Sequence, residues 1–234
     1  MKLAIFPGTF NPIHIGHLMI AESACIQFGL EKIKLVVSPF PPNKLNSKDF
    51  LPINKRVALI EEAIKDNPRF EIDLREINRK GPSYTVETIH ELIQEFNLRA
   101  KEPSQPPLSG RSKKEFDLYC HPEKGDLGGF LKEKIHFIMG VDSFLSLPSW
   151  HKAHELKEYC KFLIASRPGW QKIDVKDSLS SFHDEIEWEI IDSPPLAISS
   201  TQIRSRKREN KSYRYLLPER VYEIYKNLDI ENRY

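Results

Sequence analysis

Short apolar runs alternate with longer amphipathic stretches along this chain of 234 residues. Apolar runs bounded by turn-forming residues are typical of buried strands, and they predict strands at 2–6, 33–38, 69–73, 134–140, 161–166 and 187–192. Apolar residues at helical spacing predict helices over 16–28, 55–65, 85–96, about 149–159, from 199 onwards and about 218–227. Strands that alternate with helices in this way predict an α/β fold with a mostly parallel, doubly wound sheet.

The same helical spacing predicts which side chains face the core. In the first helix the inward positions are Leu18, Ala21, Cys25 and Phe28. In the second they are Val57, Ile60, Ala63 and Ile64. Ser199 is expected to be the N-cap of a later helix, because Gln202 follows it at capping-box spacing.

The pattern fails between 97 and 134, where Pro, Gly, Ser and Lys cluster without periodicity. A long irregular segment inside a compact domain is typical of an insertion, a lid or disorder. We therefore expect one domain over 1–234, with an irregular insertion at about 97–134 and a small C-terminal helical segment at 199–234.

Ligands of doubly wound sheets bind beyond the carboxyl ends of the strands. In this chain that rule directs attention to the segments 8–17, 38–44, 140–150, residue 167 and 199–204.

Composition narrows the classes of function. The chain has 35 basic and 33 acidic residues, a net charge of +2, whereas a nucleic-acid binder should present one dominant sign. Its three cysteines are scattered and form no CxxC pair, which favours a reducing compartment. The apolar run at the N-terminus is too short for a signal peptide or a membrane span. We expect a cytoplasmic protein that binds neither nucleic acid nor membrane; a homo-oligomer is possible.

The stretch GTFNPIHIGHL, from Gly8 to Leu18, follows the first predicted strand and begins the first helix. Gly8 allows the backbone to approach a ligand closely, and unpaired N–H groups at a helix start favour an anion. His14 and His17 could both donate hydrogen bonds to phosphate oxygens. Two alternatives stay open: a metal site, for which no third ligand is evident, and ordinary polar residues at a helix start.

A second candidate phosphate motif lies near the C-terminus. Ser199, Ser200 and Thr201 begin a helix, and Arg204 follows one turn later. Hydroxyl and N–H donors at a helix start, together with a guanidinium fork, suit phosphate oxygens. The alternative is an ordinary capped helix with a solvated basic face over 204–208.

These two stretches resemble known signatures. GTFNPIHIGH closely resembles the signature loop of the nucleotidyltransferase superfamily, and ISSTQIR resembles the ISSTxIR motif of small adenylyltransferases. Class I aminoacyl-tRNA synthetases also carry HIGH, but they are normally much longer and have a KMSKS motif that this chain lacks.

Three further stretches resemble the nicotinate mononucleotide adenylyltransferases: SPFPPNK, GPSYTVET and GVDSFLSLPSWHKAHEL. The resemblance covers nearly the whole chain with its motifs in order. Pro7 and Asn11 depart from the common residues of the signature loop, and the insertion is longer than the usual connection. The resemblance implies a Rossmann-like fold and the transfer of AMP from ATP to nicotinic acid mononucleotide, with release of pyrophosphate, in NAD biosynthesis.

The resemblance also implies roles for individual residues. His14, His17 and Arg204 would be the catalytic phosphate contacts. The ATP-binding residues would be Gly8, Thr9, Phe10, Gly16, Gly140, Asp142, Ser199, Ser200 and Thr201. The acceptor-binding residues would be Lys44, Tyr84, Thr85 and Trp150, although Lys44 could also be a surface residue and Trp150 a core residue.

The nucleophile of this reaction is already an anion, so no general base is needed. Mg²⁺ would bind mainly through the phosphates of ATP, with no metal site of protein side chains. Three alternatives remain: a cytidylyltransferase or another small adenylyltransferase, for example one acting on phosphopantetheine; a nucleotide-binding sensor without catalysis; and a nucleic-acid binder that uses the basic run at 204–208.

Overall fold

In the computed structural model, residues 2–39, 50–81, 83–101, 134–166 and 179–228 are described, without the side chains of 97–101. Most of the predicted insertion therefore lies outside the described residues, as do Lys44 and residue 167. Within the described residues no helix is long and apolar enough to cross a bilayer.

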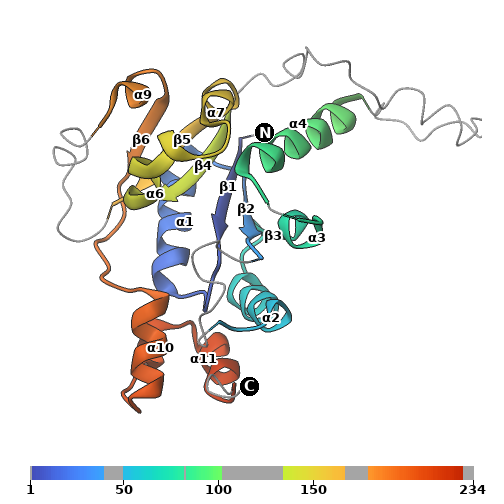
Figure 1. The fold of residues 1–234 in the computed structure, drawn as a ribbon. Coiled ribbons are helices and arrows are strands. Elements are labelled where there is room, and N and C mark those ends of the chain that lie inside the picture. Colours follow the sequence, from blue (N-terminus) through green and yellow to red (C-terminus); the bar gives the residue numbers. More distant parts are fainter. Residues whose placement is uncertain (1, 40–49, 82, 102–133, 167–178, 229–234) are drawn as a thin grey trace, which may run out of the picture.

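The sheet has six strands that are all parallel, in the order β3-β2-β1-β4-β5-β6. Figure 1 shows β1 in the interior of this sheet. The predicted fold class is confirmed, and each predicted strand is present within about two residues of its expected ends. The strands are β1 Leu3–Gly8, β2 Lys32–Val37, β3 Phe70–Asp73, β4 Ile135–Gly140, β5 Cys160–Ala165 and β6 Glu187–Ile191.

The longer helices begin and end close to where the apolar pattern predicts, except that α4 continues five residues beyond its predicted end at Phe96. They are α1 Ile15–Phe28, α2 Ile53–Ile64, α4 Thr85–Lys101, α10 Ser200–Arg208 and α11 Glu219–Tyr225. Ser199 is the N-cap of α10, and its side chain accepts a hydrogen bond from the backbone N–H of Gln202 at 3.2 Å. Two helices of four residues each, α3 Arg75–Asn78 and α9 Ser181–Asp184, were not predicted, because so short a segment carries no helical periodicity.

The helix predicted at about 149–159 is wrong in its extent. The structure has α6 Val141–Ser146, a 3₁₀ turn η2 at Leu147–Ser149, and α7 Ala153–Tyr159. Lys152 precedes α7 with a left-handed backbone, φ 53°, so the α-helical path cannot begin before Ala153. The apolar residues of 141–147 belong to a separate short helix that starts directly after β4.

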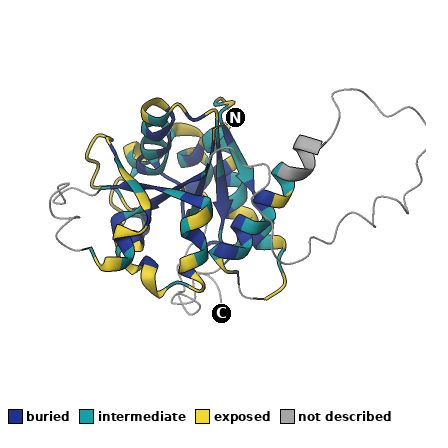
Figure 2. Cartoon of the chain, turned by 90° about the horizontal axis from the view of Figure 1, so that it is seen from above, coloured by how far each residue is buried: buried dark blue, intermediate teal, exposed yellow. Residues whose placement is uncertain are grey.

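The strands contribute side chains to two hydrophobic cores, because successive side chains point to opposite faces of the sheet. In β1, Ala4 and Phe6 pack into one core with α1, α2 and α11. Leu3 and Ile5 pack into the other with α4, α6 and α7. Figure 2 shows the buried residues concentrated between these two helical layers.

The inward face of α2 differs from the predicted one. The structure buries Arg56, Leu59 and Ile60, whereas the sequence pattern placed Val57 inward. Ile60 faces the core as predicted, and Ala63 and Ile64 pack partly buried against it. The helix is thus rotated by about one residue position, so that an arginine occupies the apolar stripe.

β1 and β4 mark the point where the order of the strands reverses. β1 pairs with β2 along its whole length, but with β4 only at Ala4–His136 and Ile5–Phe137. Pro7, which has no N–H to donate, lies beyond the last of these pairs. The carboxyl ends of β1 and β4 are therefore unpaired with each other, and such a switch point is where ligands of open α/β sheets bind.

Candidate active site

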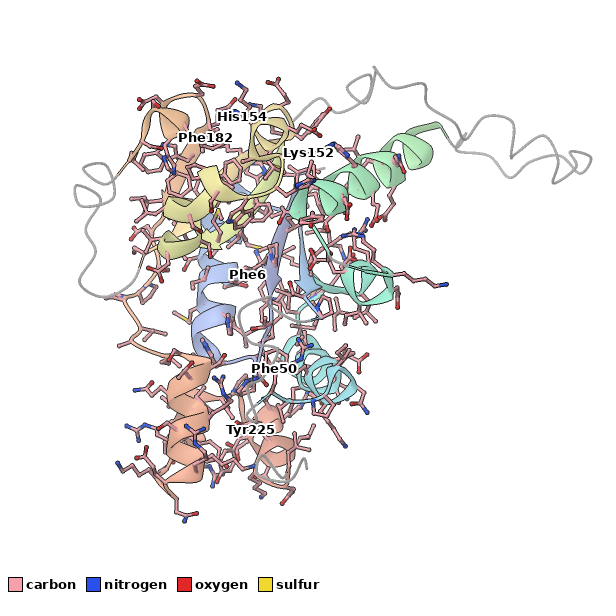
Figure 3. The ribbon with its side chains drawn as sticks, in the orientation of Figure 1. Phe6, Phe50, Lys152, His154, Phe182 and Tyr225 are labelled. Carbon is pink, nitrogen blue, oxygen red and sulfur yellow. The ribbon has the colours of Figure 1, made fainter. Side chains whose placement is uncertain are left out.

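A cavity of about 310 Å³ lies at the carboxyl ends of β1, β4 and β5. Figures 1 and 3 show that α10, from the far end of the chain, lies at the same end of the molecule as α2. The lining comes from the first loop, the ends of β4 and β5, and the segment that leads into α10. It comprises Phe6, Thr9, Asn11, His14, Gly16, His17, Met19, Ile20, Phe50, Gly140, Ser143, Ala165, Ser166, Ser193, Pro194, Leu196, Ile198, Ser199, Ser200, Thr201 and Arg204.

The first loop is built around a buried phenylalanine. Phe10 is 1% exposed and has a positive φ of 44°. Its ring lies so close to Gly8 that a Cβ at Gly8 would be 2.9 Å from ring atom Cζ. Gly8 is therefore required by the packing of Phe10. Neither Gly8 nor Phe10 lines the cavity, although both were predicted to bind ATP.

Gly16 is required by a similar close approach. A Cβ there would lie 3.0 Å from Nδ1 of the His14 ring. Gly16 and His14 both line the cavity, so this glycine makes room for the histidine beside the ligand space.

The two histidines form a stacked pair. Their ring centroids are 3.7 Å apart with an interplanar angle of 26°. The backbone N–H of His14 donates to Nδ1 of His17 at 3.2 Å. Since Nδ1 of His17 accepts this bond, the proton of its neutral ring lies on Nε2. His17 thus retains one N–H donor for a ligand.

Burial keeps both rings neutral near pH 7. Desolvation lowers the pKa of His14 from 6.5 to about 4. Desolvation, and secondarily the neighbouring His14, hold the pKa of His17 well below 6.5. His14 is 5% exposed, and its buried Nδ1 has no hydrogen-bond partner among the described residues. The pair therefore presents neutral imidazole groups, in place of the imidazolium that the sequence also allowed.

The two motifs predicted to bind phosphate are joined directly. Nη1 of Arg204 donates to the carbonyl of Asn11 at 2.7 Å. The hydroxyl of Ser200 donates to the carbonyl of Pro12 at 2.8 Å. The N-terminus of α10 is therefore held against the first loop, and residues of both helix starts line one cavity, where unpaired backbone N–H groups favour an anion.

Arg204 is 8% exposed and also donates from Nη2 to the hydroxyl of Thr201 at 3.2 Å. Part of its guanidinium fork thus holds protein groups in place, which the linear sequence did not indicate. Arg204 still lines the cavity.

Most of the predicted ATP-binding residues meet at this cavity. Besides His14, His17 and Arg204, those that line it are Thr9, Gly16, Gly140, Ser199, Ser200 and Thr201. Asp142 does not line it. Asp142 is an exposed residue of α6, and Ser143, its neighbour, lines the cavity.

The predicted acceptor residues that the structure describes lie elsewhere. Tyr84 is 40% exposed, and its ring lies 4.3 Å from that of His151. Trp150 packs edge to face against Phe137 at 6.1 Å, as part of the core that covers the α4 side of the sheet. Tyr84, Thr85 and Trp150 are absent from the lining of the cavity, and Lys44 is outside the described residues.

The sequence analysis missed three groups of this site. The segment at 193–198 follows β6 and lines the cavity through Ser193, Pro194, Leu196 and Ile198; the strand-end rule, applied to β6, would have found it. Asn11 accepts hydrogen bonds from Arg204 and, at its side chain, from the backbone N–H of Leu51 at 3.0 Å. Arg56 contacts the first loop at the carbonyl of Thr9, and its position within an apolar stripe was the available signal.

Among the described residues, no group of three or more His, Cys, Asp or Glu side chains is placed to hold a metal ion. Within the same residues the cavity lining includes no carboxylate. Its polar groups are hydroxyls, imidazoles, an amide and a guanidinium, which is a set suited to anionic oxygens.

Comparison with known proteins identifies the family to which this chain belongs. The model of the family described as "Cytidylyltransferase-like" matches residues 5–206. The chain belongs to this family. Within it, the chain is 31% identical over 222 residues to the nicotinate-nucleotide adenylyltransferase of Bacillus subtilis strain 168, which covers 94% of this chain and 93% of that protein.

A second relative comes from Desulfitobacterium hafniense strain Y51. It is named "Probable nicotinate-nucleotide adenylyltransferase" and is 34% identical over 222 residues, covering 94% of this chain and 90% of that protein. These full-length similarities confirm the predicted membership among the nicotinate-nucleotide adenylyltransferases.

Among solved structures, the nicotinic acid mononucleotide adenylyltransferase of Plasmodium falciparum complexed with NaAD has the same fold. It superposes with a TM-score of 0.62 at 14% identity, over 95% of this chain and 93% of that chain. The same enzyme complexed with APC gives a TM-score of 0.59. At this identity the similarity shows the fold alone.

Proposed function

We propose that this protein transfers AMP from ATP to nicotinic acid mononucleotide, forming nicotinic acid adenine dinucleotide and pyrophosphate. The observation that carries the proposal is the junction of the two phosphate motifs at one cavity. Arg204 donates to the backbone of Asn11, so the loop of His14 and His17 and the start of α10 face the same space. The two relatives described above are named for this activity, and they are similar to this chain over nearly its full length.

The site needs little covalent chemistry. The acceptor phosphate is an anion at neutral pH and attacks the α-phosphorus of ATP without a general base. Catalysis then consists of holding the two phosphates in line and neutralising the charge that builds on the α, β and γ oxygens.

Each part of the cavity has a defined role in that scheme. Nε2–H of His17 donates to a phosphate oxygen in the transition state, since its Nδ1 is occupied by the backbone of His14. His14 contributes the second imidazole. The N-terminus of α10, with the hydroxyls of Ser199 and Thr201 and the charge of Arg204, holds the β and γ phosphates.

Mg²⁺ fits this site as a partner of the nucleotide. The described lining offers oxygen donors only as hydroxyls, amide and backbone carbonyls, and Mg²⁺ usually keeps several waters and substrate phosphates as ligands. When bound, the ion would supply charge neutralisation at the phosphates, and the residues of the lining would orient those phosphates.

The residues proposed for the acceptor are separate from the described lining of the cavity: Tyr84 and Thr85 stand at the start of α4, and Trp150 packs in the core on the α4 side of the sheet. Tyr84, Thr85 and Trp150 are proposed to receive the pyridine ring, with Trp150 providing a flat apolar surface. Tyr84 and the loop of Trp150 are brought together by the contact between Tyr84 and His151. Lys44 is proposed to reach the acceptor phosphate.

A coupled assay of pyrophosphate release tests the proposal. Purified protein is given ATP and Mg²⁺ with nicotinic acid mononucleotide, nicotinamide mononucleotide or phosphopantetheine. We expect the highest kcat/KM with nicotinic acid mononucleotide. Turnover with phosphopantetheine alone would overturn the assignment, and ATP binding without pyrophosphate release for any acceptor would support a nucleotide sensor instead.

A further inference from the structure

Arg56 is the largest fully buried side chain of the described residues, with 0% exposure. It lies on α2, on the face that packs against the sheet. Burial lowers the pKa of its guanidinium from 12.5 to about 10, so the group stays charged at neutral pH. Burying a charge carries a large desolvation cost unless close partners offset it. A methionine or leucine would fill this position of an apolar stripe without that cost, so packing alone does not explain an arginine here.

The partners of Arg56 are backbone carbonyls of two separate loops. Nη1 donates to the carbonyl of Thr9 at 2.6 Å and to the carbonyl of Ser38 at 2.9 Å. Nη2 donates to the carbonyl of Pro39 at 2.8 Å. The guanidinium also lies over the ring of Phe50, 4.8 Å from its centroid.

These partners occupy functional positions. Thr9 belongs to the first loop, and both Thr9 and Phe50 line the cavity. Ser38 and Pro39 follow β2, and they begin the segment that leads to Lys44. One planar side chain therefore joins the loop that holds the histidines to the loop proposed to carry the acceptor cation. A second bond supports the same alignment, since the carbonyl of Gly8 accepts from the N–H of Ser38 at 3.0 Å.

We propose that Arg56 is a positioning residue that sets the distance between the ATP phosphates and the acceptor phosphate by binding the carbonyls of both loops at once. Arg56 is not among the described residues that line the cavity, so it acts on the reacting atoms through the groups that it binds, chiefly Thr9, Ser38 and Pro39. This inference rests on the proposed function and adds a residue outside the two phosphate motifs. Because a misplacement of about 1 Å can lower a rate about 100-fold, Arg56 should act on kcat more than on substrate affinity.

The geometry of the fork distinguishes arginine from lysine. Arginine offers two nitrogens that reach three carbonyls, whereas lysine keeps the charge as a single point donor on a flexible stem. Arg56→Lys therefore tests the fork while keeping the charge, and Arg56→Met removes both. Arg69→Lys is the matched control: Arg69 pairs with Glu22, and both side chains are more than a third exposed.

The experiment measures kcat, KM for each substrate, and the folded fraction from urea unfolding, for the wild type and the three variants. We expect Arg56→Lys to stay folded and to lose about 10- to 100-fold in kcat, with each KM changed less than about threefold. Arg56→Met should lose more, and Arg69→Lys should match the wild type. Amide hydrogen exchange at 8–11 and 36–38 should be faster in Arg56→Lys than in the wild type, with the rest of the sheet unchanged.

Three results would overturn the inference. A wild-type kcat in Arg56→Lys would show that charge alone is enough. A kcat loss that equals the loss of folded protein, with uniform acceleration of exchange, would show a purely structural role. A higher KM for ATP at constant kcat would show direct ligand binding. Failure of the wild type to release pyrophosphate would count against the proposed function; the exchange measurement would still decide whether Arg56 holds the two loops.

Discussion

His14 should make the stability of this protein depend on pH in a predictable window. Its pKa is about 4 in the folded protein and 6.5 without burial. As the pH falls below about 6.5, the unfolded chain takes up the proton first, so the free energy of unfolding decreases. The decrease continues until the folded protein also protonates near pH 4, and His17, whose pKa is lowered too, acts in the same direction.

The size of the effect follows from the two pKa values. Between about pH 7.5 and about pH 5, His14 alone should remove about 2 kcal/mol from the free energy of unfolding. Its full contribution, reached below pH 4, would be about 3 kcal/mol. An effect of about 2 kcal/mol is a large share of the stability of an ordinary domain.

Urea unfolding followed by tryptophan fluorescence measures this effect. The wild type and His14→Gln are compared at both pH values; glutamine is polar but does not titrate. Other titrating groups are common to both proteins, so the difference between their pH dependences reports His14 together with its smaller effect on the pKa of His17. We expect His14→Gln to lose about 2 kcal/mol less than the wild type on acidification, with similar m values. Equal losses in both proteins, within about 0.5 kcal/mol, would refute the reasoning.

Three further predictions concern the same end of the sheet and its support. His17→Asn keeps an acceptor where Nδ1 of His17 receives the His14 N–H, but it loses the Nε2 donor. The variant should fold normally and lose about 100-fold or more in kcat. A loss below about tenfold in a pyrophosphate assay would contradict a transition-state contact. A Gly→Ala change in a helix ordinarily stabilises it by about 1 kcal/mol, but the Cβ of Gly16→Ala would lie 3.0 Å from the His14 ring. We therefore expect no gain in Tm and a several-fold lower kcat. A more stable, fully active variant would contradict this close approach. Thr88→Val removes the hydroxyl that donates to the buried Glu76 carboxylate at 3.0 Å and should cost about 1–3 kcal/mol in urea unfolding. A loss below about 0.5 kcal/mol would contradict a contribution from this bond.

The architecture of this protein was readable from local patterns. Strand and helix positions follow from periodicity, and the ends of α1 and α10 follow from Gly29 and Ser199. These signals depend on residues within a few positions of one another, so they need no knowledge of the fold. The two phosphate motifs are also contiguous segments, and their residue types already indicated anion binding.

The tertiary structure decided what those segments do together. The strand order places β1 beside β4, although their sequences lie more than a hundred residues apart, and so creates the cavity between their ends. The bond from Arg204 to Asn11 spans 193 positions, and no local pattern could reveal it. The same applies to Arg56, whose place on the apolar face of α2 is explained only by the carbonyls of the two loops that it binds.

The charge state of His14 and the packing around Gly8 also depend on the fold. The sequence allowed His14 to be an imidazolium, but burial lowers its pKa to about 4. Gly8 suggested a close approach to a ligand, and the structure shows the ring of Phe10 in that place. The sequence by itself determined which elements form and which chemistry the loops carry. Only the packed sheet determined which loops meet and in which protonation state, because burial and long-range contacts arise when distant segments are brought together.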